Sequence, residues 1–183
     1  MKELSGIDVG SLRVVKYPDP VLSLPAKAVE RFDDALRALA EGMFKVMYDA
    51  RGVGLAAPQV GVSIRLFVAN PEASPGEGEA AYVNPEIVGP DGSVVHEEGC
   101  LSVPGINCRV KRFATLTLRA LDLDGQAVEV PAEGLAARIF QHEIDHLNGV
   151  LLINRMSAVA RMASRRVIKE LEEAYAGEGE EAS

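Results

Sequence analysis

Apolar side chains recur at helical spacing in three segments of the chain. The first segment begins at Asp33, which can cap a helix, and ends near Gly52. The second covers about Gly134–Leu147, and the third begins after Ser157 and reaches about Tyr175. This spacing predicts three helices, of which one lies in the N-terminal third of the chain and two lie near its C-terminus.

Between the first two helices, short runs of β-branched and aromatic residues predict strands. The expected strands are 64–68, 82–88, 94–97, 115–121 and 127–130. A turn at Asp124-Gly125 joins the last two strands as a hairpin. Hairpins outnumber crossover helices in this pattern. The sequence therefore predicts an α+β fold, with antiparallel sheets packed around the second helix and a further helix at the C-terminal end.

Composition and charge add to this picture mainly by excluding some classes of protein. The chain has 183 residues and a formal net charge of −8, which argues for a folded protein and against sequence-specific nucleic-acid binding. It has no apolar run long enough to span a bilayer, and two cysteines cannot build a disulfide framework. We expect a cytoplasmic protein with one catalytic domain over 1–176 and a disordered acidic tail over 177–183.

The second helix carries His142-Glu143-Ile144-Asp145-His146, the pattern H-E-x-x-H. Residues four apart lie on one face of a helix, so both imidazoles can reach the same metal ion. Glu143 stands beside the first ligand, where its carboxylate can serve a water molecule instead of the metal. The motif therefore predicts a catalytic metal site on this helix.

A catalytic metal site of this kind needs a third protein ligand. The third histidine of the metzincin pattern is absent, because Leu152 occupies its position. Glu170 or Glu172 could serve as in a small zinc peptidase, but both lie in a run of alternating charge typical of a solvated helix. Cys100 is the stronger candidate, because glycines and a proline around it indicate a shaped loop. Cys108 lacks such a setting, and we expect it to be structural.

A glycine-rich loop covers 52–61. Its residues 52–57 fit the dinucleotide fingerprint G-x-G-x-x-A, but that motif must follow a strand and open a helix, and this loop follows a helix. We therefore interpret it as a rigid loop whose backbone approaches a ligand closely, with Gln59 offering an uncharged NH₂ donor.

Three segments now stand in one order along the chain. They read Gly52-Val53-Gly54-Leu55-Ala56-Ala57-Pro58-Gln59, Glu98-Gly99-Cys100-Leu101-Ser102 and Gln141-His142-Glu143-Ile144-Asp145-His146-Leu147. Together they resemble the motifs G-x-G-L-A-A-x-Q, E-G-C-L-S and Q-H-E-x-D-H-L of the peptide deformylase family. Tyr17-Pro18-Asp19-Pro20 resembles the N-terminal segment of that family, so the likeness extends over nearly the whole chain.

The resemblance implies the activity and a role for each motif residue. The activity is removal of the formyl group from the N-terminal formyl-methionine of newly made polypeptides, which releases formate. The implied metal ligands are Cys100, His142 and His146, and the implied catalytic acid and base is Glu143. The implied oxyanion donors are the Gln59 side chain and the Leu101 backbone N–H. The implied substrate-binding residues are Val53, Gly54 and Gly99.

Thiolate and imidazole ligands suit zinc or ferrous iron equally well. The resemblance favours Fe²⁺ in cells, with Zn²⁺, Ni²⁺ or Co²⁺ able to occupy the site. His96 and Arg138 flank the motifs. We expect a neighbouring polar role for His96, because a fourth protein ligand would close the site to water. Arg138 can influence the shape of the pocket.

Two rival interpretations remain at the level of the sequence. One is the small zinc peptidase already described, and the other is a protein in which zinc only stabilises the fold. Glu143 argues against the second, because a structural site is closed by four ligands and needs no base. The third helix also carries a basic cluster, made of Arg161, Arg165, Arg166 and Lys169. This cluster is either a solvated face or a surface that docks on the ribosome, and the resemblance supports docking.

Overall fold

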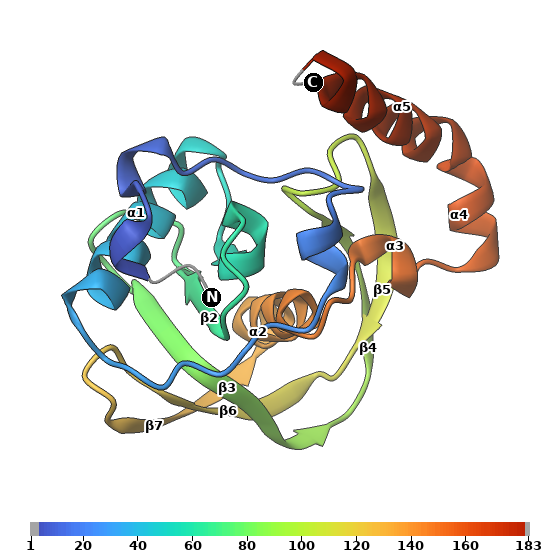
Figure 1. Ribbon diagram of the computed structural model, residues 1–183. Coiled ribbons are helices and arrows are strands. Elements are labelled where there is room, and N and C mark those ends of the chain that lie inside the picture. The colour runs from blue at the N-terminus through green and yellow to red at the C-terminus, as the bar shows by residue number, and fades with distance from the viewer. Residues whose placement is uncertain (1–3, 182–183) are drawn as a thin grey trace.

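The computed structural model of the protein describes residues 4–181 (Figure 1). A five-stranded sheet, a two-stranded sheet and α-helices make up the fold, and every strand pair in both sheets is antiparallel. The larger sheet has the order β1-β2-β3-β6-β7. Its strands are β1 (Gly54–Ala56), β2 (Leu66–Ala69), β3 (Ala80–Asp91), β6 (Thr115–Leu121) and β7 (Ala127–Glu133). The α+β prediction with antiparallel sheets is confirmed.

Helix α2 (Gly134–Leu147) has the bounds that its apolar spacing predicts, and it lies between the two sheets (Figure 1). Its Phe140 packs with Phe67 of β2 and Tyr82 of β3, with ring centroids 5.0 to 5.9 Å apart. This aromatic cluster belongs to the buried core that joins α2 to the larger sheet. Because α2 is packed on several sides, its inward face is held in a fixed position.

Helix α1 (Asp34–Asp49) starts as predicted, with the Asp33 carboxylate accepting a hydrogen bond from the Leu36 N–H at 3.1 Å. It ends at Asp49, close to the stop predicted near Gly52. Arg51 takes the left-handed conformation there, with φ of 57°. Its N–H donates to the Tyr48 carbonyl, and the Gly52 N–H donates to that of Met47. This is the Schellman arrangement, which ordinarily places glycine where Arg51 stands.

The smaller sheet pairs β4 (Val94–Gly99) with β5 (Asn107–Arg112). Strand β5 is absent from the sequence prediction, although its side chains alternate between exposed and buried. The buried positions are Cys108, Val110 and Arg112, and the arginine hides the apolar alternation on which the prediction depends. Cys108 packs with Val110 and Leu152, in agreement with the structural role expected for it.

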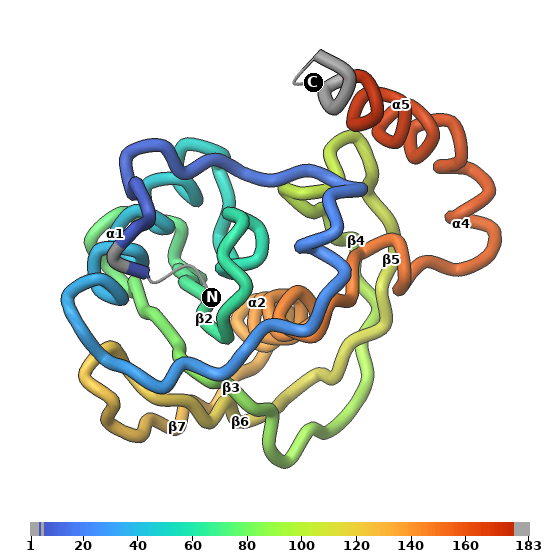
Figure 2. Tube along the Cα trace, in the orientation of Figure 1, coloured from blue at the N-terminus to red at the C-terminus, as the bar shows by residue number. Residues whose placement is uncertain are grey.

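The third predicted helix is interrupted in the structure. A short helix α3 (Leu152–Arg155) precedes it, and the segment itself divides into α4 (Ala158–Ala163) and α5 (Arg165–Glu181), with a break at Ser164. The trace leaves the body of the protein at α4 and returns along α5 to the loop between β4 and β5 (Figure 2). The disordered tail over 177–183 stays a prediction, because α5 continues through Glu181 and residues 182–183 lie outside the described part.

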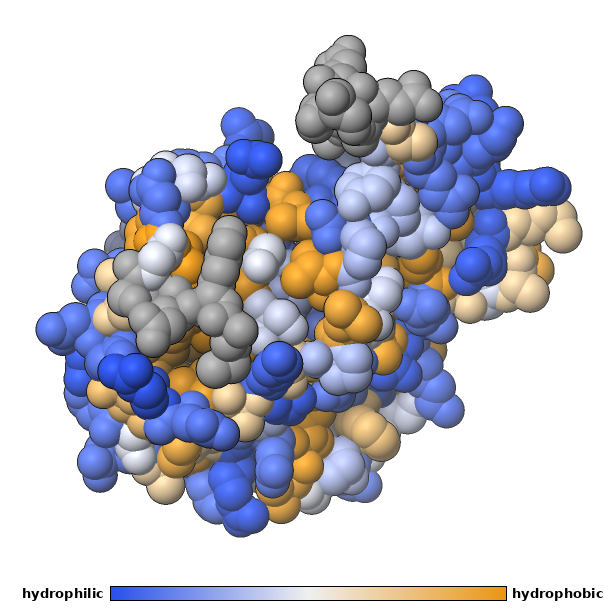
Figure 3. Space-filling view, in the orientation of Figure 1, coloured by the Kyte–Doolittle hydropathy of each residue, from blue (hydrophilic) through white to orange (hydrophobic). Residues whose placement is uncertain are grey.

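The surface of α4 and α5 is mostly hydrophilic in the view of Figure 3. Val159 and Met162 of α4 are exceptions, with 79% and 77% of their surface exposed. On its inner side, α5 packs Val167, Ile168 and Leu171 against the cluster that contains Val103. Among the described residues, no helix is long and apolar enough to cross a membrane. The single-domain interpretation of 1–176 stays a prediction.

Candidate metal centre and active site

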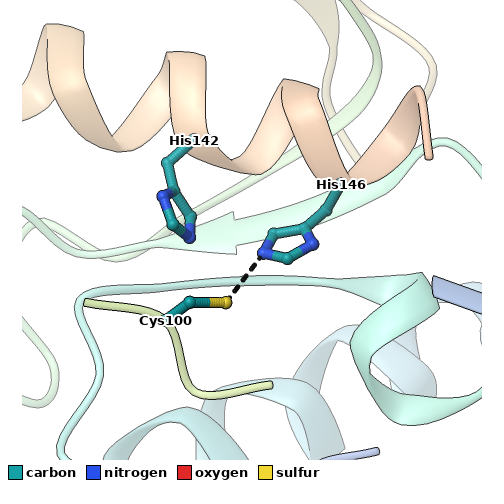
Figure 4. A group of neighbouring side chains, drawn as sticks. All are labelled: Cys100, His142 and His146. Atoms are coloured by element: carbon teal, nitrogen blue, oxygen red, sulfur yellow. Dashed lines mark hydrogen bonds between the residues drawn. The ribbon is translucent and has the colours of Figure 1, made fainter. Parts of the chain in front are cut away.

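Two elements bring three metal-binding side chains together (Figure 4). His142 and His146 stand one turn apart on α2, and Cys100 follows the last residue of β4. The ligand atoms of all three lie within 4.8 Å of one another. The Cys100 Sγ is 3.3 Å from the His146 Nε2. The structure therefore assembles the thiol and the two imidazoles that the sequence indicates as metal ligands.

A chain of charged groups orients the first histidine. The His142 Nδ1 lies 3.1 Å from a Glu98 carboxylate oxygen. Arg112 of β5 donates from Nε and Nη2 to the two oxygens of that carboxylate, each at 2.9 Å, and from Nη1 to Asp145 at 2.6 Å. Arg155 also donates to Asp145, at 3.0 Å from its Nε. Because Glu98 holds the Nδ1 side of the ring, the His142 Nε2 faces the metal site.

The charges around the site shift the pKa values of its groups. Burial raises the pKa of Glu98, but hydrogen bonds from Arg112 and His142 outweigh it and bring this pKa to about 2. Burial lowers the pKa of His142, but hydrogen bonds to Cys100 and Glu98 raise it to about 10. For His146, burial and the charges of His142 and Arg112 hold the pKa well below the usual value.

Glu143 is buried beside the two histidines, and its Oε2 has no hydrogen-bond partner. Burial raises its pKa to about 7, against the lowering effect of the positive charges on His142 and Arg112. A group with a pKa near neutrality can both accept and donate a proton during a reaction. Its Oε1 would lie 2.5 Å from a Cβ built on Gly54, so this position must be glycine for the carboxylate to reach the site.

Gln59 approaches the site from a short 3-10 helix (Ala57–Val60) that follows β1. Its Oε1 accepts a hydrogen bond from the Ala56 N–H at 2.8 Å, which fixes the orientation of the amide. The Nε2 then points toward the site, at 3.3 Å from the Ser102 Oγ and 3.8 Å from the Cys100 Sγ. A donor held in this way can stabilise negative charge next to the metal.

An N-terminal segment joins the two loops that carry Gln59 and Cys100. The Val15 N–H donates to the Gln59 carbonyl at 2.8 Å, and the Tyr17 N–H donates to the Ser102 carbonyl at 2.8 Å. Between them, the Lys16 Nζ donates to the Leu101 carbonyl at 2.7 Å. The resemblance singled out Tyr17 only as part of a motif, and the structure shows that this segment fixes the two loops relative to each other.

A cavity of about 450 Å³ opens over the site. It is lined by Arg51, Gly52, Val53, Gly54, Gln59, Glu97, Glu98, Gly99, Cys100, Leu101, Leu135, Arg138, Ile139, His142 and Glu143. All predicted catalytic and substrate-binding residues belong to this lining. An extended peptide end can therefore enter the cavity and reach the ligand cluster.

Other residues considered from the sequence lie outside the cluster. His96 is exposed on β4 and is not among the described metal-binding groups, so it gives no fourth ligand. Glu172 accepts a hydrogen bond from the Tyr17 hydroxyl at 2.7 Å, and Glu170 pairs with Arg166 on the surface of α5. The zinc peptidase interpretation, which requires one of these glutamates as third ligand, is not favoured.

The residues fit a divalent metal by the chemistry of the donor set. One sulfur and two imidazole nitrogens converge, with Glu98 supporting His142 from behind and an unpartnered carboxylate oxygen of Glu143 beside them. Three ligands leave a position for water or substrate, which separates a catalytic site from a structural one. The fold and the site together define a metal-dependent hydrolase of the H-E-x-x-H type.

The chain belongs to the peptide deformylase family. The family model described as polypeptide deformylase matches residues 11–162. The peptide deformylase of Acidobacterium capsulatum is 48% identical over 162 residues, which cover 88% of this chain and 95% of that protein. The chloroplastic peptide deformylase 1B of Oryza sativa subsp. japonica is 47% identical over 166 residues, covering 90% of this chain and 62% of that protein.

Solved structures agree with this assignment. Arabidopsis thaliana peptide deformylase 1B in complex with an inhibitor has a TM-score of 0.88 and 42% identity, covering 91% of this chain and 93% of that chain. A peptide deformylase from Legionella pneumophila has a TM-score of 0.83 and 46% identity, covering 91% and 98% of the two chains. The chain is therefore an enzyme of this family.

Arg112 is the main site residue that sequence analysis missed. Its side chain is 4% exposed, and it joins the carboxylate behind His142 to Asp145 of the same helix. Its signal in the sequence is weak, because a lone arginine at the end of a strand is usually solvated. The strand pairing places Arg112 opposite Val94 and Glu98 opposite Cys108, so the contact between the two charges is seen only in the folded side chains.

Proposed function

We propose that this protein hydrolyses the formyl group from N-formyl-methionyl peptides and releases formate. The observation that carries the proposal is the convergence of Cys100, His142 and His146 on one point beside Glu143, whose Oε2 has no hydrogen-bond partner. The family assignment supports the substrate, since the relatives are named peptide deformylases. The peptidase alternative requires a glutamate as third ligand, and the metal-binding group found among the described residues contains none.

A divalent cation held by these three residues would supply a Lewis acid that polarises the formyl carbonyl and acidifies water. Glu143 accepts the proton of the attacking water and delivers it to the amine that leaves. The Gln59 NH₂ and the Leu101 N–H donate hydrogen bonds to the oxygen on which negative charge develops. One such donor contributes roughly 3 kcal/mol in the transition state.

The substrate backbone and the methionine side chain lie in the cavity under this proposal. Val53, Gly54 and Gly99 line it, and the absence of side chains on both glycines lets a peptide backbone approach closely. A Cβ on Gly99 would lie 2.6 Å from the Asn107 Oδ1, so a larger residue here would displace the Asn107 side chain.

The test is formate release from formyl-Met-Ala by protein purified without oxygen and assayed for metal. We expect turnover that requires the metal, no cleavage of internal peptide bonds, and at least a hundredfold preference in kcat/KM for formyl-Met over acetyl-Met peptides. The acetyl methyl group displaces the carbonyl from its donors, and misplacement by an ångström costs on the order of a hundredfold. Cleavage of internal bonds without formate release would favour the peptidase.

Fe²⁺ is the proposed metal in cells, with Zn²⁺, Ni²⁺ or Co²⁺ able to replace it, and the cytoplasm is the proposed location. A thiolate with two imidazoles accepts each of these ions. Iron and the Cys100 thiolate are both sensitive to oxidation. We therefore expect activity that falls in air and returns after metal exchange to Ni²⁺ only when Cys100 is still reduced.

Docking of the C-terminal helices on the ribosome is also proposed, on the basic residues of α4 and α5. Two of these cations already pair within α5, Arg166 with Glu170 at 3.3 Å and Lys169 with Glu173 at 3.2 Å, which leaves fewer charges for phosphate. Cosedimentation with ribosomes should weaken steeply as salt rises. Binding that is unchanged after all four basic residues are replaced by glutamine would exclude this surface.

A further inference from the structure

Two arginines line the cavity but take no part in the reaction proposed for it. Arg51 follows α1 next to the Val53-Gly54 segment, and Arg138 stands one turn before His142 on the same face of α2. They therefore reach the cavity from two different elements, beyond the residues that surround the formyl group.

Neither arginine has an acidic partner in the described part of the chain. The ion pairs found there involve other residues. The Nε of Arg138 is buried and has no hydrogen-bond partner at all. Buried polar groups in folded proteins are almost always satisfied, so no partner within the described residues holds this donor in place.

The backbone of Arg51 gives a second, independent observation. Its φ of 57° lies in the left-handed region, at the helix end where glycine is strongly preferred. A residue with a Cβ is disfavoured in this conformation. The arginine therefore occupies the position at a conformational cost, and its side chain reaches the lining of the active-site cavity.

The carboxylates that line the cavity do not neutralise Arg51 and Arg138. Glu98 is engaged by Arg112 and His142, and Glu143 is the buried proton carrier. Only the exposed Glu97 could compete, and its cross-strand neighbour on β5 is Arg109. Among the described residues, no ion pair joins Glu97 to Arg51 or Arg138.

We propose that Arg51 and Arg138 bind a carboxylate of the peptide substrate, so that the enzyme favours peptides with Asp or Glu in the two residues after the formyl-methionine. The inference rests on the proposed function, because it takes the peptide to lie in this cavity. Successive side chains of an extended peptide point to opposite faces. The two substrate residues after the formyl-methionine therefore present one side chain to each wall of the cavity.

The expected size of the substrate preference follows from the strength of ion pairs between an arginine and a carboxylate. Ion pairs that remain partly solvated contribute up to about a fivefold change in binding, and a cation with a buried donor contributes more. We expect a preference in kcat/KM of about five- to twentyfold for glutamate over glutamine. The preference should shrink as ionic strength rises from about 0.01 to 0.5 M, because salt screens the exposed partner.

The test compares four amidated peptides, formyl-Met-Glu-Ala, formyl-Met-Gln-Ala, formyl-Met-Ala-Glu and formyl-Met-Ala-Gln. Amidation removes the terminal carboxylate, so the side chain is the only added charge. At least one glutamate peptide should exceed its glutamine counterpart in the parent enzyme. The ratio should fall to about one in Arg51→Gln/Arg138→Gln. The control Arg119→Gln/Arg166→Gln removes the same charge outside the cavity and should keep the parent ratio.

The outcomes separate this inference from the proposed function. If the glutamine and glutamate peptides release formate at equal rates, the proposed carboxylate site is wrong and the proposed deformylation still stands. No formate from any peptide by metal-loaded protein would overturn both. If the double variant fails to fold, the parent enzyme still decides, since formyl-Met-Lys-Ala and formyl-Met-Ala-Lys should then be poorer substrates than both glutamine peptides. Lysine peptides cleaved as fast as glutamate peptides would contradict the proposal.

Discussion

Arg112 supplies no metal ligand, yet it holds the carboxylate that orients His142. Its guanidinium bridges Glu98 and Asp145, and the side chains of all three are at most 11% exposed. Removing one partner of a buried ion pair leaves the others unpaired, which costs several kcal/mol. Outer groups of this kind also change metal affinity by roughly 10- to 100-fold.

We therefore expect Arg112→Gln to lower the free energy of unfolding by about 3 kcal/mol and to speed metal loss to a chelator at least tenfold. The control is Arg119→Gln, which breaks the exposed pair with Glu129 and should change stability by less than about 1 kcal/mol. Chemical denaturation and the rate of metal transfer measure the two effects. Parent-like metal retention in a destabilised Arg112 variant would show that Glu98 orients His142 without this support.

The two cysteines provide a matched pair for the metal site. Cys100→Ser removes the thiolate from the ligand cluster, so metal binding should weaken strongly. Cys108→Ser changes a buried side chain in the small cluster with Val110 and Leu152, so the metal should stay near one per chain. Metal analysis after gel filtration measures both. Equal metal content in the two variants would remove Cys100 from the ligand set.

The left-handed backbone of Arg51 predicts an effect on stability that is separate from substrate binding. Arg51→Gly relieves the strain at the end of α1 and should raise the free energy of unfolding by about 1 kcal/mol. Arg51→Ala is the matched control, because alanine loses the guanidinium but keeps the Cβ that causes the strain. A glycine variant no more stable than the alanine variant would contradict this account of the helix end.

Only some of the residues in the site can be predicted from the sequence. His142, His146 and Glu143 are predictable because H-E-x-x-H is set by helical spacing, a local property. Cys100 is indicated by the composition of its loop and by the family motif instead. Arg51 and Arg112 are not predictable in this way, since one depends on a backbone angle and the other on side-chain contacts with Glu98 and Asp145.

Helix α5 acts on the active site through packing. Val167, Ile168 and Leu171 belong to the cluster that contains Val103 and Ile106, and these two residues follow Cys100 in the same loop. A Cβ on Gly105 would lie 3.4 Å from the Val167 side chain, which shows how closely α5 approaches this loop. The helix therefore supports the loop that carries Cys100.

Truncation after Ser157 should lower the melting temperature by several degrees and reduce deformylation of short peptides, because the loop loses its apolar cover. The control Val159→Ser/Met162→Ser changes two side chains that are 79% and 77% exposed and should leave stability within about 0.5 kcal/mol per site. Thermal unfolding and formate release measure both. Full activity and stability of the truncated chain would restrict α5 to an external role.

At the level of elements, the strength of the local pattern decides what can be predicted. Strand β6 has the predicted bounds because its buried positions alternate throughout, and helix α2 has them because its apolar residues recur at helical spacing up to Leu147. The break at Ser164 is not visible in the apolar spacing, since α4 exposes its apolar residues. Strand β1 is three residues long and lies in a glycine-rich loop, so its pairing with β2 comes from the tertiary fold.

The whole molecule brings together groups that are far apart in the chain. Gln59, Cys100 and His142 come from three segments, and the backbone of Val15 and Tyr17 joins the first two. Hydrophobic patterning alone does not predict this arrangement, because it specifies which face of an element is buried and not which loops meet. The motif resemblance supplied it, since three motifs in one order indicate a common fold.

The central claim is that Cys100, His142 and His146 hold the metal while Glu143 moves the proton. The most direct test is the metal content of Glu143→Gln together with its kcat for formate release from formyl-Met-Ala. The account predicts one metal ion per chain, an unchanged fold and a kcat lower by at least about a hundredfold. A metal-loaded Glu143→Gln protein with a kcat near that of the parent would contradict it.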